Sequence, residues 1–346
     1  MNGKTSGILC ILSLAVILAV LFAGCTTPPS TTVTPTATPA ATPAATAVAT
    51  TAPVVTANAT ATPTSAAHEA GTLLIATTTS LYDTGLLNKI QDTYQNKTGV
   101  KLKITSQGTG QAIQLAQRGD VDLLLVHSPS QEKTFLDNGY GANQRCFAYN
   151  YFMIVGPAND PAGIKGTNAT TAFAKIEAAG MDGKKGVAFV SRGDNSGTHT
   201  AEQGIWAKAG FNYTKNISNS GPWYLSIGKG MGDTLLMASQ KGAYTLTDEG
   251  TYLAYKSQLN LTPLVTNDTV LLNRYSAIAV NPAKNPNVNE VEADKFINWL
   301  ISPEGKQLVA DYGVDKYGKG LFTPLTPELA SQAQFNCTCC SNVTPA

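Results

Sequence analysis

Three short segments of the sequence combine hydroxyl side chains with glycine and could together surround a small anion. They are residues 77–80 (Thr-Thr-Thr-Ser), 107–111 (Gln-Gly-Thr-Gly-Gln) and 191–199 (Ser-Arg-Gly-Asp-Asn-Ser-Gly-Thr-His). Each follows an apolar run and lies near the start of a segment with helical spacing. The first turn of a helix exposes unpaired N–H groups with a partial positive charge, which favours anions. Hydroxyl groups add neutral donors, glycine lets the backbone approach a ligand, and Arg192 adds a permanently charged fork of donors.

Each segment taken alone has a simpler explanation. Residues 77–80 can be an ordinary helix N-cap. Residues 108–110 can be a turn, and they do not complete a dinucleotide-binding motif because Ile113 occupies the last glycine position. Arg192 can be a surface ion-pair partner of Asp194. The recurrence of the same design at three predicted strand ends favours a common anion site.

The apolar pattern from Gly71 onward predicts the elements that position these segments. Short apolar runs alternate with segments of helical spacing, which indicates an α/β fold with a parallel sheet. Strands are expected at residues 73–76, 100–105, 122–126, 149–155, 187–190, 243–246 and 277–280. Helices are expected at residues 81–97, 109–118, 131–138, 171–179, 198–209, 233–241, 248–256, 289–301 and 303–312.

The folded part is large enough for two lobes. It spans about 275 residues, more than one hydrophobic core usually holds. Two predicted strands end at Gly156-Pro157 and at Asn281-Pro282, and these are natural crossings between lobes. Lobe I then comprises residues 71–151 and 276–335, and lobe II comprises residues 152–275. Two connecting strands form a hinge, so the three segments can face each other across the cleft between the lobes.

The N-terminal 25 residues have the character of a signal peptide and are excluded from the fold. Lys4 precedes a run at residues 8–22 that is apolar except for Ser13, and the tripeptide Ala-Gly-Cys that ends at Cys25 resembles a lipobox. Cys25 is therefore the expected lipid attachment site, with an uncleaved membrane anchor as the alternative. Residues 26–67 are almost entirely Thr, Ala, Pro, Ser and Val, which is typical of a disordered stalk. We expect an extracytoplasmic protein anchored to the cell membrane.

The cysteines outside the N-terminal segment predict disulfides. Cys146 and the three cysteines of the 336–346 tail form an even set in an oxidising compartment, so one or two bridges are expected, with the pairing open. The tail cysteines are Cys337, Cys339 and Cys340. Their spacing is not that of a zinc ribbon, so neither a metal site nor a cofactor is expected.

Composition and motifs argue against several other classes of protein. The formal net charge is +1 and only 14% of the residues are charged, so no field attracts nucleic acid. Residues 228–232 lack the spacing of a Walker loop. Ser, His and Asp occur together at residues 191–199 without a Gly-x-Ser-x-Gly motif. A surface hydrolase is thus the weaker alternative, and we expect no enzyme and no catalytic residue.

Several motifs resemble those of one known family, the tungstate-binding proteins of ABC transporters (the TupA type). The resemblance covers essentially residues 71–322. The motifs that carry it are Ala76-Thr77-Thr78-Thr79-Ser80, Gly108-Thr109-Gly110-Gln111-Ala112, Gly119-Asp120-Val121-Asp122, Val126-His127-Ser128-Pro129, Tyr149-Asn150-Tyr151-Phe152, Val155-Gly156-Pro157, Ser191-Arg192-Gly193-Asp194-Asn195-Ser196-Gly197-Thr198-His199 and Gly242-Ala243-Tyr244-Thr245-Leu246-Thr247-Asp248.

The resemblance implies a type II periplasmic-binding fold, closure of a monomer around an oxyanion, and delivery to ABC permease and ATPase subunits. Arg192 is then the single charge of the site. Asp194 and His127 are expected to support the binding residues, and His199 is expected to be structural. This chain departs from the family in its long stalk, in its Cys-containing tail and in Asn195, where Asp is commoner. Matching positions suggest as donors Thr78, Thr79, Ser80, Thr109, Ser196, Gly197 and Thr198.

The nature of the donors bears on which anion is expected. A hydrogenphosphate ion carries a proton that needs an acceptor, and the third predicted strand ends with His127-Ser128 rather than with an acid. A cage of donors alone favours a fully deprotonated anion such as tungstate, molybdate or sulfate. The third segment also resembles the Arg-x-x-Gly-Ser-Gly-Thr arrangement of phosphate receptors. Molybdate, phosphate and sulfate therefore remain alternatives to tungstate, and a surface sensor of the same fold remains an alternative to transport.

Overall fold

The structure is a computed structural model that describes residues 71–330. The predicted signal segment with Cys25, the 26–67 stalk and the tail cysteines Cys337, Cys339 and Cys340 lie outside the described residues. Within residues 71–330, no helix is long and apolar enough to cross a membrane.

The described residues are built around a mixed sheet of eight strands. The order is β10-β4-β9-β3-β1-β2, and β7 and β8 both pair with β4. A second sheet of two parallel strands contains β5 and β6. The strands are β1 (Thr72–Thr78), β2 (Lys101–Gln107), β3 (Leu123–Val126), β4 (Gly141–Gly156), β5 (Phe189–Ser191), β6 (Tyr224–Ser226), β7 (Thr245–Asp248), β8 (Thr262–Val265), β9 (Leu272–Val280) and β10 (Thr323–Pro324).

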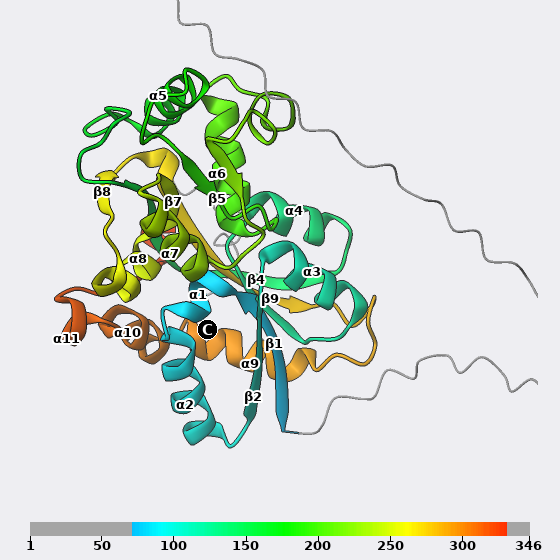
Figure 1. Ribbon diagram of the computed structural model, residues 1–346. Coiled ribbons are helices and arrows are strands. Elements are labelled where there is room, and N and C mark those ends of the chain that lie inside the picture. The colour runs from blue at the N-terminus through cyan, green and yellow to red at the C-terminus, as the bar shows by residue number, and fades with distance from the viewer. Residues whose placement is uncertain (1–70, 331–346) are drawn as a thin grey trace, which may run out of the picture. The chain divides into compact units, whose positions relative to one another are not determined.

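Helices follow most of the strands and pack against the sheets (Figure 1). The α-helices are α1 (Thr79–Asp83), α2 (Leu86–Thr98), α3 (Thr109–Arg118), α4 (Pro129–Asp137), α5 (Ala169–Met181), α6 (Gly197–Lys208), α7 (Met231–Lys241), α8 (Glu249–Tyr255), α9 (Glu290–Leu300), α10 (Pro303–Asp311), α11 (Val314–Tyr317) and α12 (Pro327–Ala330). Three further short turns of helix are η1 (Tyr213–Ile217), η2 (Lys256–Gln258) and η3 (Thr269–Leu271).

The long strand β4 takes part in both halves of the fold. Its first part pairs with β9, from Gly141 opposite Val280 to Tyr151 opposite Leu272. Its last part pairs instead with β7 and β8. Helices α2 and α9 lie at one end of these strands, and α5 and α6 lie at the other (Figure 1). Because β9 also returns to β3, the two long strands form the connection that a two-lobed fold requires.

Separate apolar cores fill the two ends of the fold. One core includes Leu73, Tyr94 and Phe296, and it belongs to β1, α2 and α9. Another includes Phe173 and Trp206, which lie on α5 and α6. This separation supports the two lobes, while the lobe boundaries at residues 151–152 and 275–276 stay a prediction.

Several expectations from the sequence differ from the structure. Strands β6, β8 and β10 were not expected, and the strand expected at residues 277–280 begins at Leu272. The single helix expected at residues 81–97 is two helices, because Gly85 adopts a left-handed φ of 83° between α1 and α2. The strand expected at residues 149–155 begins eight residues earlier, at Gly141 rather than Tyr149. The sheet is mixed rather than parallel, because β9 returns from the other lobe and runs antiparallel to both of its neighbours, β3 and β4.

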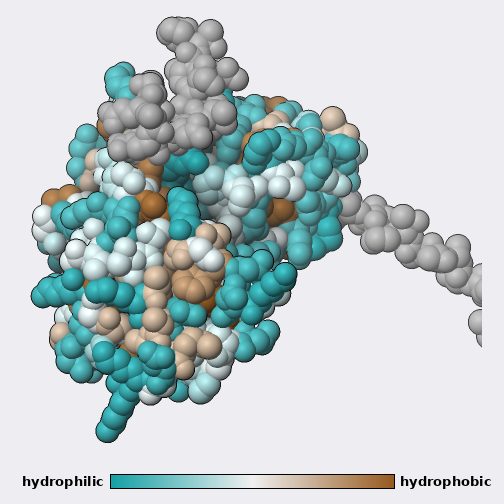
Figure 2. Space-filling view, turned by 90° about the horizontal axis from the view of Figure 1, so that it is seen from above, coloured by the Kyte–Doolittle hydropathy of each residue, from teal (hydrophilic) through white to brown (hydrophobic). Residues whose placement is uncertain are grey.

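Apolar side chains on the surface are scattered. On the face that Figure 2 shows, the apolar areas form separate patches among hydrophilic ones. Within residues 71–330, the exposed large hydrophobic residues lie on five different helices: Tyr82, Met181, Leu236, Val291 and Val314.

Candidate anion-binding site

The N-termini of α3 and α6 meet where the two lobes touch. The Gly110 amide in the first turn of α3 donates to the Asn195 carbonyl, which precedes α6, at 3.2 Å. A Cβ atom on Gly108 would lie 3.1 Å from the carbonyl oxygen of Asp194 and 3.6 Å from the Cα of Ser196. Glycine at this position therefore permits the close approach of two helix starts, whose first amides have no acceptor within their own helices.

Arg192 lies buried at this junction, with 1% of its surface exposed. Its Nη2 donates to the Thr79 hydroxyl of lobe I at 2.8 Å and to Asp194 Oδ2 at 2.5 Å. The prediction that Asp194 pairs with Arg192 is confirmed. Nε and Nη1 of Arg192 have no hydrogen-bond partner among residues 71–330. A buried guanidinium with two free donor groups has the capacity to bind an anion bidentately.

Three buried hydroxyls among residues 71–330 share this unpaired state, and two of them, on Thr109 and Thr198, belong to predicted donors; the third is Ser128 Oγ, directly before α4. Thr109 on α3 is fully buried and Thr198 on α6 is 1% exposed. Neither Oγ1 atom has a hydrogen-bond partner in the described part of the chain. Leaving a buried polar group unpaired costs about 1–3 kcal/mol, so such groups usually mark a place for water or a ligand.

Two other predicted donors serve as helix caps. Thr78 Oγ1 accepts the Leu81 amide at 3.4 Å, and Ser196 Oγ accepts the His199 amide at 3.2 Å. A hydroxyl that accepts such a bond still has its own hydrogen to donate. The cap interpretation and the anion interpretation of these segments are therefore compatible.

The loop before α6 is held by its own side chains. Asp194 Oδ1 accepts the Ser196 amide at 3.2 Å, and His199 Nδ1 accepts the Asn195 amide at 3.0 Å. Asn195 adopts a left-handed φ of 56°, a conformation that asparagine tolerates better than most residues. His199 thus fixes the turn that points the α6 N-terminus at the site.

Ser80 and His127 lie beside the same junction. The Ser80 hydroxyl is 2.9 Å from His127 Nε2, and both residues are buried. A Cβ atom on Gly197 would lie 2.8 Å from two atoms of the His127 ring. Burial lowers the pKa of His127 to about 4, with the nearby Arg192 charge acting in the same direction. His127 is therefore neutral near pH 7.

All of the predicted site residues are thus brought into one region. Thr78, Thr79, Ser80 and Thr109 approach it from lobe I, together with His127. Arg192, Asp194, Ser196, Gly197 and Thr198 approach it from lobe II. Residues 71–330 contain no group of three or more His, Cys, Asp or Glu side chains placed to hold a metal ion.

Comparisons with known proteins identify the family of this chain. Residues 62–304 match the family model described as a PBP superfamily domain. The tungstate-binding protein TupA of Peptoclostridium acidaminophilum is 42% identical over 257 residues, which cover 73% of this chain and 86% of that protein. The chain belongs to the TupA-type periplasmic binding proteins.

Solved structures of TupA-type proteins share the fold. A tungstate-binding protein TupA from Desulfovibrio alaskensis G20 is 43% identical, with a TM-score of 0.60, and the match covers 74% of this chain and 99% of that chain. A structure described as the tungstate ABC transporter from Geobacter sulfurreducens is 41% identical, with a TM-score of 0.61, over 70% of this chain and 98% of that one. The predicted type II periplasmic-binding fold is confirmed.

Sequence reasoning missed a buried carboxyl group behind the site of this TupA-type chain. Glu202 on α6 accepts hydrogen bonds from the Ser191 hydroxyl at 2.6 Å, the Tyr224 hydroxyl at 2.6 Å and Trp206 Nε1 at 3.1 Å. It therefore anchors the residue that precedes Arg192. A glutamate on a helix usually faces the solvent. The one sequence signal for burial was that Glu202 lies four residues before Trp206, on the same helix face. Burial raises the pKa of Glu202 to about 7.

We expect Glu202→Gln to make the TupA-type fold less sensitive to pH. A carboxyl group with a pKa near 4.5 unfolded and about 7 folded binds its proton more tightly when folded. The free energy of unfolding therefore falls as pH rises through that window, by up to about 3 kcal/mol. Glutamine can keep the bonds to Tyr224 and Trp206 and can donate to Ser191. Urea unfolding at pH 5 and pH 8 measures the effect, and equal pH slopes for both proteins would contradict it.

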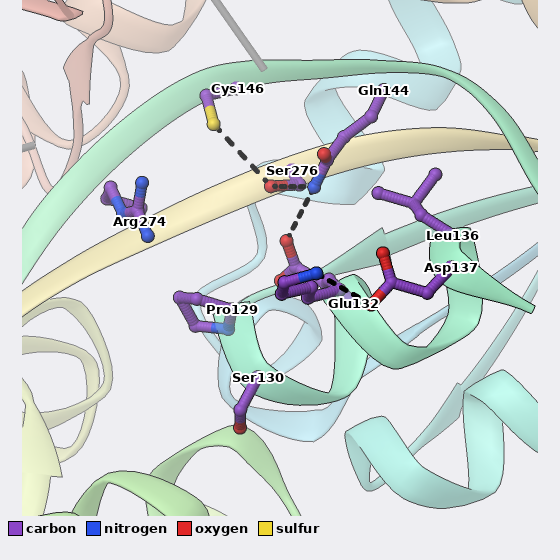
Figure 3. Close-up of a pocket in the computed structure, with 10 residues that line it drawn as sticks. Pro129, Ser130, Glu132, Leu136, Asp137, Gln144, Cys146, Arg274 and Ser276 are labelled. Atoms are coloured by element: carbon purple, nitrogen blue, oxygen red, sulfur yellow. Dashed lines mark hydrogen bonds and ion pairs between the residues drawn. The ribbon is translucent and has the colours of Figure 1, made fainter. Parts of the chain in front are cut away.

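A separate cavity of the TupA-type chain lies away from the anion site. It has a volume of about 490 Å³ and lies beside Glu132, Gln144, Cys146, Arg274 and Ser276 (Figure 3). None of its lining residues is a predicted binding residue. Cys146, which is buried and disulfide-bonded, contributes to its wall.

Proposed function

We propose that this chain is an extracytoplasmic receptor that captures a tetrahedral oxyanion, with tungstate as the preferred ligand, for uptake by an ABC transporter. The observation that carries the proposal is a set of unpaired buried donors near two helix starts. Arg192 Nε and Nη1, Thr109 Oγ1 and Thr198 Oγ1 have no partners among residues 71–330. They lie beside the starts of α3 and α6.

The charge of this site suits a doubly charged anion better than a neutral or organic ligand. The Arg192 cation is already balanced in part by Asp194. Both Asp194 oxygens are engaged, Oδ2 by Arg192 and Oδ1 by the Ser196 amide. Hydroxyls and helix amides therefore supply most of the stabilisation, and they can do so from every side of a tetrahedral ion.

The binding cycle follows from the contacts between the lobes. Arg192 of lobe II bonds to Thr79 of lobe I, and Gly110 of lobe I bonds to Asn195 of lobe II. An anion that also touches both lobes stabilises this closed arrangement. The closed form is then recognised by permease and ATPase subunits. Cys25 would carry the lipid anchor, and residues 26–67 would act as the spacer from the membrane. No covalent step is needed, so no enzyme activity is part of the proposal.

Titration calorimetry of the purified protein with four anions tests the ligand. Tungstate is expected to bind at least about 100-fold more tightly than phosphate, because the cage offers no free carboxylate to a protonated ligand. Molybdate has the same charge and shape as tungstate and is the closest competitor, and sulfate is smaller. Preferred binding of phosphate would overturn the assignment of the anion. If none of the four anions binds, the assignment as an oxyanion receptor is wrong, and a surface hydrolase or sensor is the alternative.

A further inference from the structure

The Ser80 hydroxyl differs from the other predicted donors because its hydrogen has another acceptor. His127 is neutral near pH 7, so only one of its ring nitrogens carries a hydrogen. Its Nδ1 faces Asn273 Oδ1 at 2.9 Å, and its Nε2 faces Ser80 Oγ at 2.9 Å. Since an amide oxygen can only accept, the hydrogen belongs on Nδ1. Nε2 must then accept, and Ser80 is the donor.

A chain of buried amides fixes this direction. Asn273 Nδ2 donates to Asn150 Oδ1 at 2.9 Å and to the Tyr275 hydroxyl at 2.8 Å. Asn150 Nδ2 in turn faces two acceptors, Asp248 Oδ1 and the Leu321 carbonyl, each at 3.5 Å. Both amides thus have their NH₂ groups turned away from His127. Turning Asn273 over would place its NH₂ against the His127 ring and set its oxygen against the oxygen of Asn150, so that the bond between the two amides is lost.

The orientation of the Ser80 hydroxyl determines whether this residue attracts or repels an anion in the cleft. Ser80 turns a lone pair, rather than a hydrogen, toward its other neighbours, which include Thr78 Oγ1 at 3.4 Å. A lone pair directed at a dianion is repulsive. One added proton on His127 Nε2 removes the conflict without moving a heavy atom: Nε2–H donates to Ser80 Oγ, and the Ser80 hydrogen becomes free to donate to the anion.

Building on the proposed function, we propose that the site binds its dianion together with one proton, held on the line from the ligand through Ser80 to His127. The proton comes from the solvent and is taken up at His127 Nε2 when the anion enters. His127 is in this account a positioning residue that acts on the ligand through Ser80.

The groups around His127 are consistent with a proton that arrives only with the anion. Arg192 and Asp194 face it from the loop before α6, and Tyr275 on β9 stacks on it with ring centroids 5.0 Å apart. Phe152 on β4 covers another side. Burial and Arg192 keep the ring neutral in the empty site, where its pKa is about 4. A dianion beside Arg192 opposes both effects and raises the pKa of His127.

Calorimetry of the purified full chain in two buffers of different ionisation enthalpy measures the proton uptake. With tungstate at pH 6.5 and micromolar concentration, the wild type is expected to take up at least about half a proton per anion. The His127→Gln variant is expected to take up none and to bind tungstate about 10-fold more weakly. Glu202→Gln tests the other buried group behind this loop that could take up a proton at pH 6.5, since the pKa of its carboxyl is about 7, and this variant should keep the uptake.

Nitrogen NMR of the wild-type protein labelled at histidine gives the same answer if His127→Gln does not fold. The chain has three histidines, so their ring signals can be assigned with one further variant at His199. We expect a neutral Nδ1–H ring in the empty protein and a ring protonated at both nitrogens with tungstate bound. Tungstate binding with no proton uptake and an unchanged ring would overturn this inference and leave the proposed function intact. Absence of any tungstate binding would overturn both.

Discussion

Replacing Arg192 with alanine is expected to weaken tungstate binding by roughly 30- to 4,000-fold, which corresponds to about 2–5 kcal/mol for breaking a buried charged contact. The variant loses the two free guanidinium donors, Nε and Nη1. It also leaves the Asp194 carboxylate without its partner beside the incoming dianion. Titration calorimetry measures the loss, and circular dichroism checks that the fold is kept.

Two further variants separate the causes of that loss. Arg192→Lys keeps the charge but cannot present two parallel donors, so it should lie between wild type and alanine. Arg192→Ala combined with Asp194→Asn removes the unpaired carboxylate and should recover part of the loss. Wild-type affinity in Arg192→Ala would show that the anion does not bind at this junction.

Replacing Gly197 with alanine is expected to weaken binding about 5- to 150-fold while leaving the thermal stability of the empty protein unchanged. The new Cβ atom would lie 2.7 Å from the carbonyl oxygen of His127 and 2.8 Å from two ring atoms. Gly197 belongs to lobe II and His127 to lobe I, so the clash exists only when the lobes are closed. Overpacking of this kind typically costs about 1–3 kcal/mol.

Gly204→Ala is the matched control for that prediction. Gly204 lies on the same helix α6, and a Cβ atom there would meet nothing within 4 Å. It should bind tungstate as the wild type does. Small-angle scattering with and without tungstate would show whether Gly197→Ala still closes. Equal affinities for the two alanine variants would mean that closure at this contact does not contribute to binding.

The elements predicted best from the sequence are those whose ends are marked by local residues such as a capping hydroxyl or a glycine. Helix α3 spans Thr109–Arg118, as its apolar spacing indicated, because Gly119 ends it with a left-handed φ of 75°. Residues 191–199 were assigned to the site because a hydroxyl cap, two glycines and one arginine occur together. In each case the information is local, so a short window of sequence contains it.

The sequence could not predict features that depend on distant partners. Asn150 and Asn273 are 123 residues apart, and nothing in either strand indicates that one amide accepts from the other. The break between α1 and α2 was hidden because the apolar spacing continues through Gly85 in phase. The early start of β4 at Gly141 depends on pairing with β9, which follows more than 100 residues later along the chain.

The position of β9 in the sheet sets an order of assembly for an exported chain. Strand β9 is one of the two neighbours of β3. It also pairs with most of the lobe I part of β4. A chain that emerges N-terminus first therefore presents β1, β2 and β3 while the centre of their sheet is still missing. The inserted segment between β4 and β9 contains its own apolar core and can fold during that interval. Lobe I closes last, so its incomplete sheet edge is the part of the molecule most exposed to misassociation during secretion.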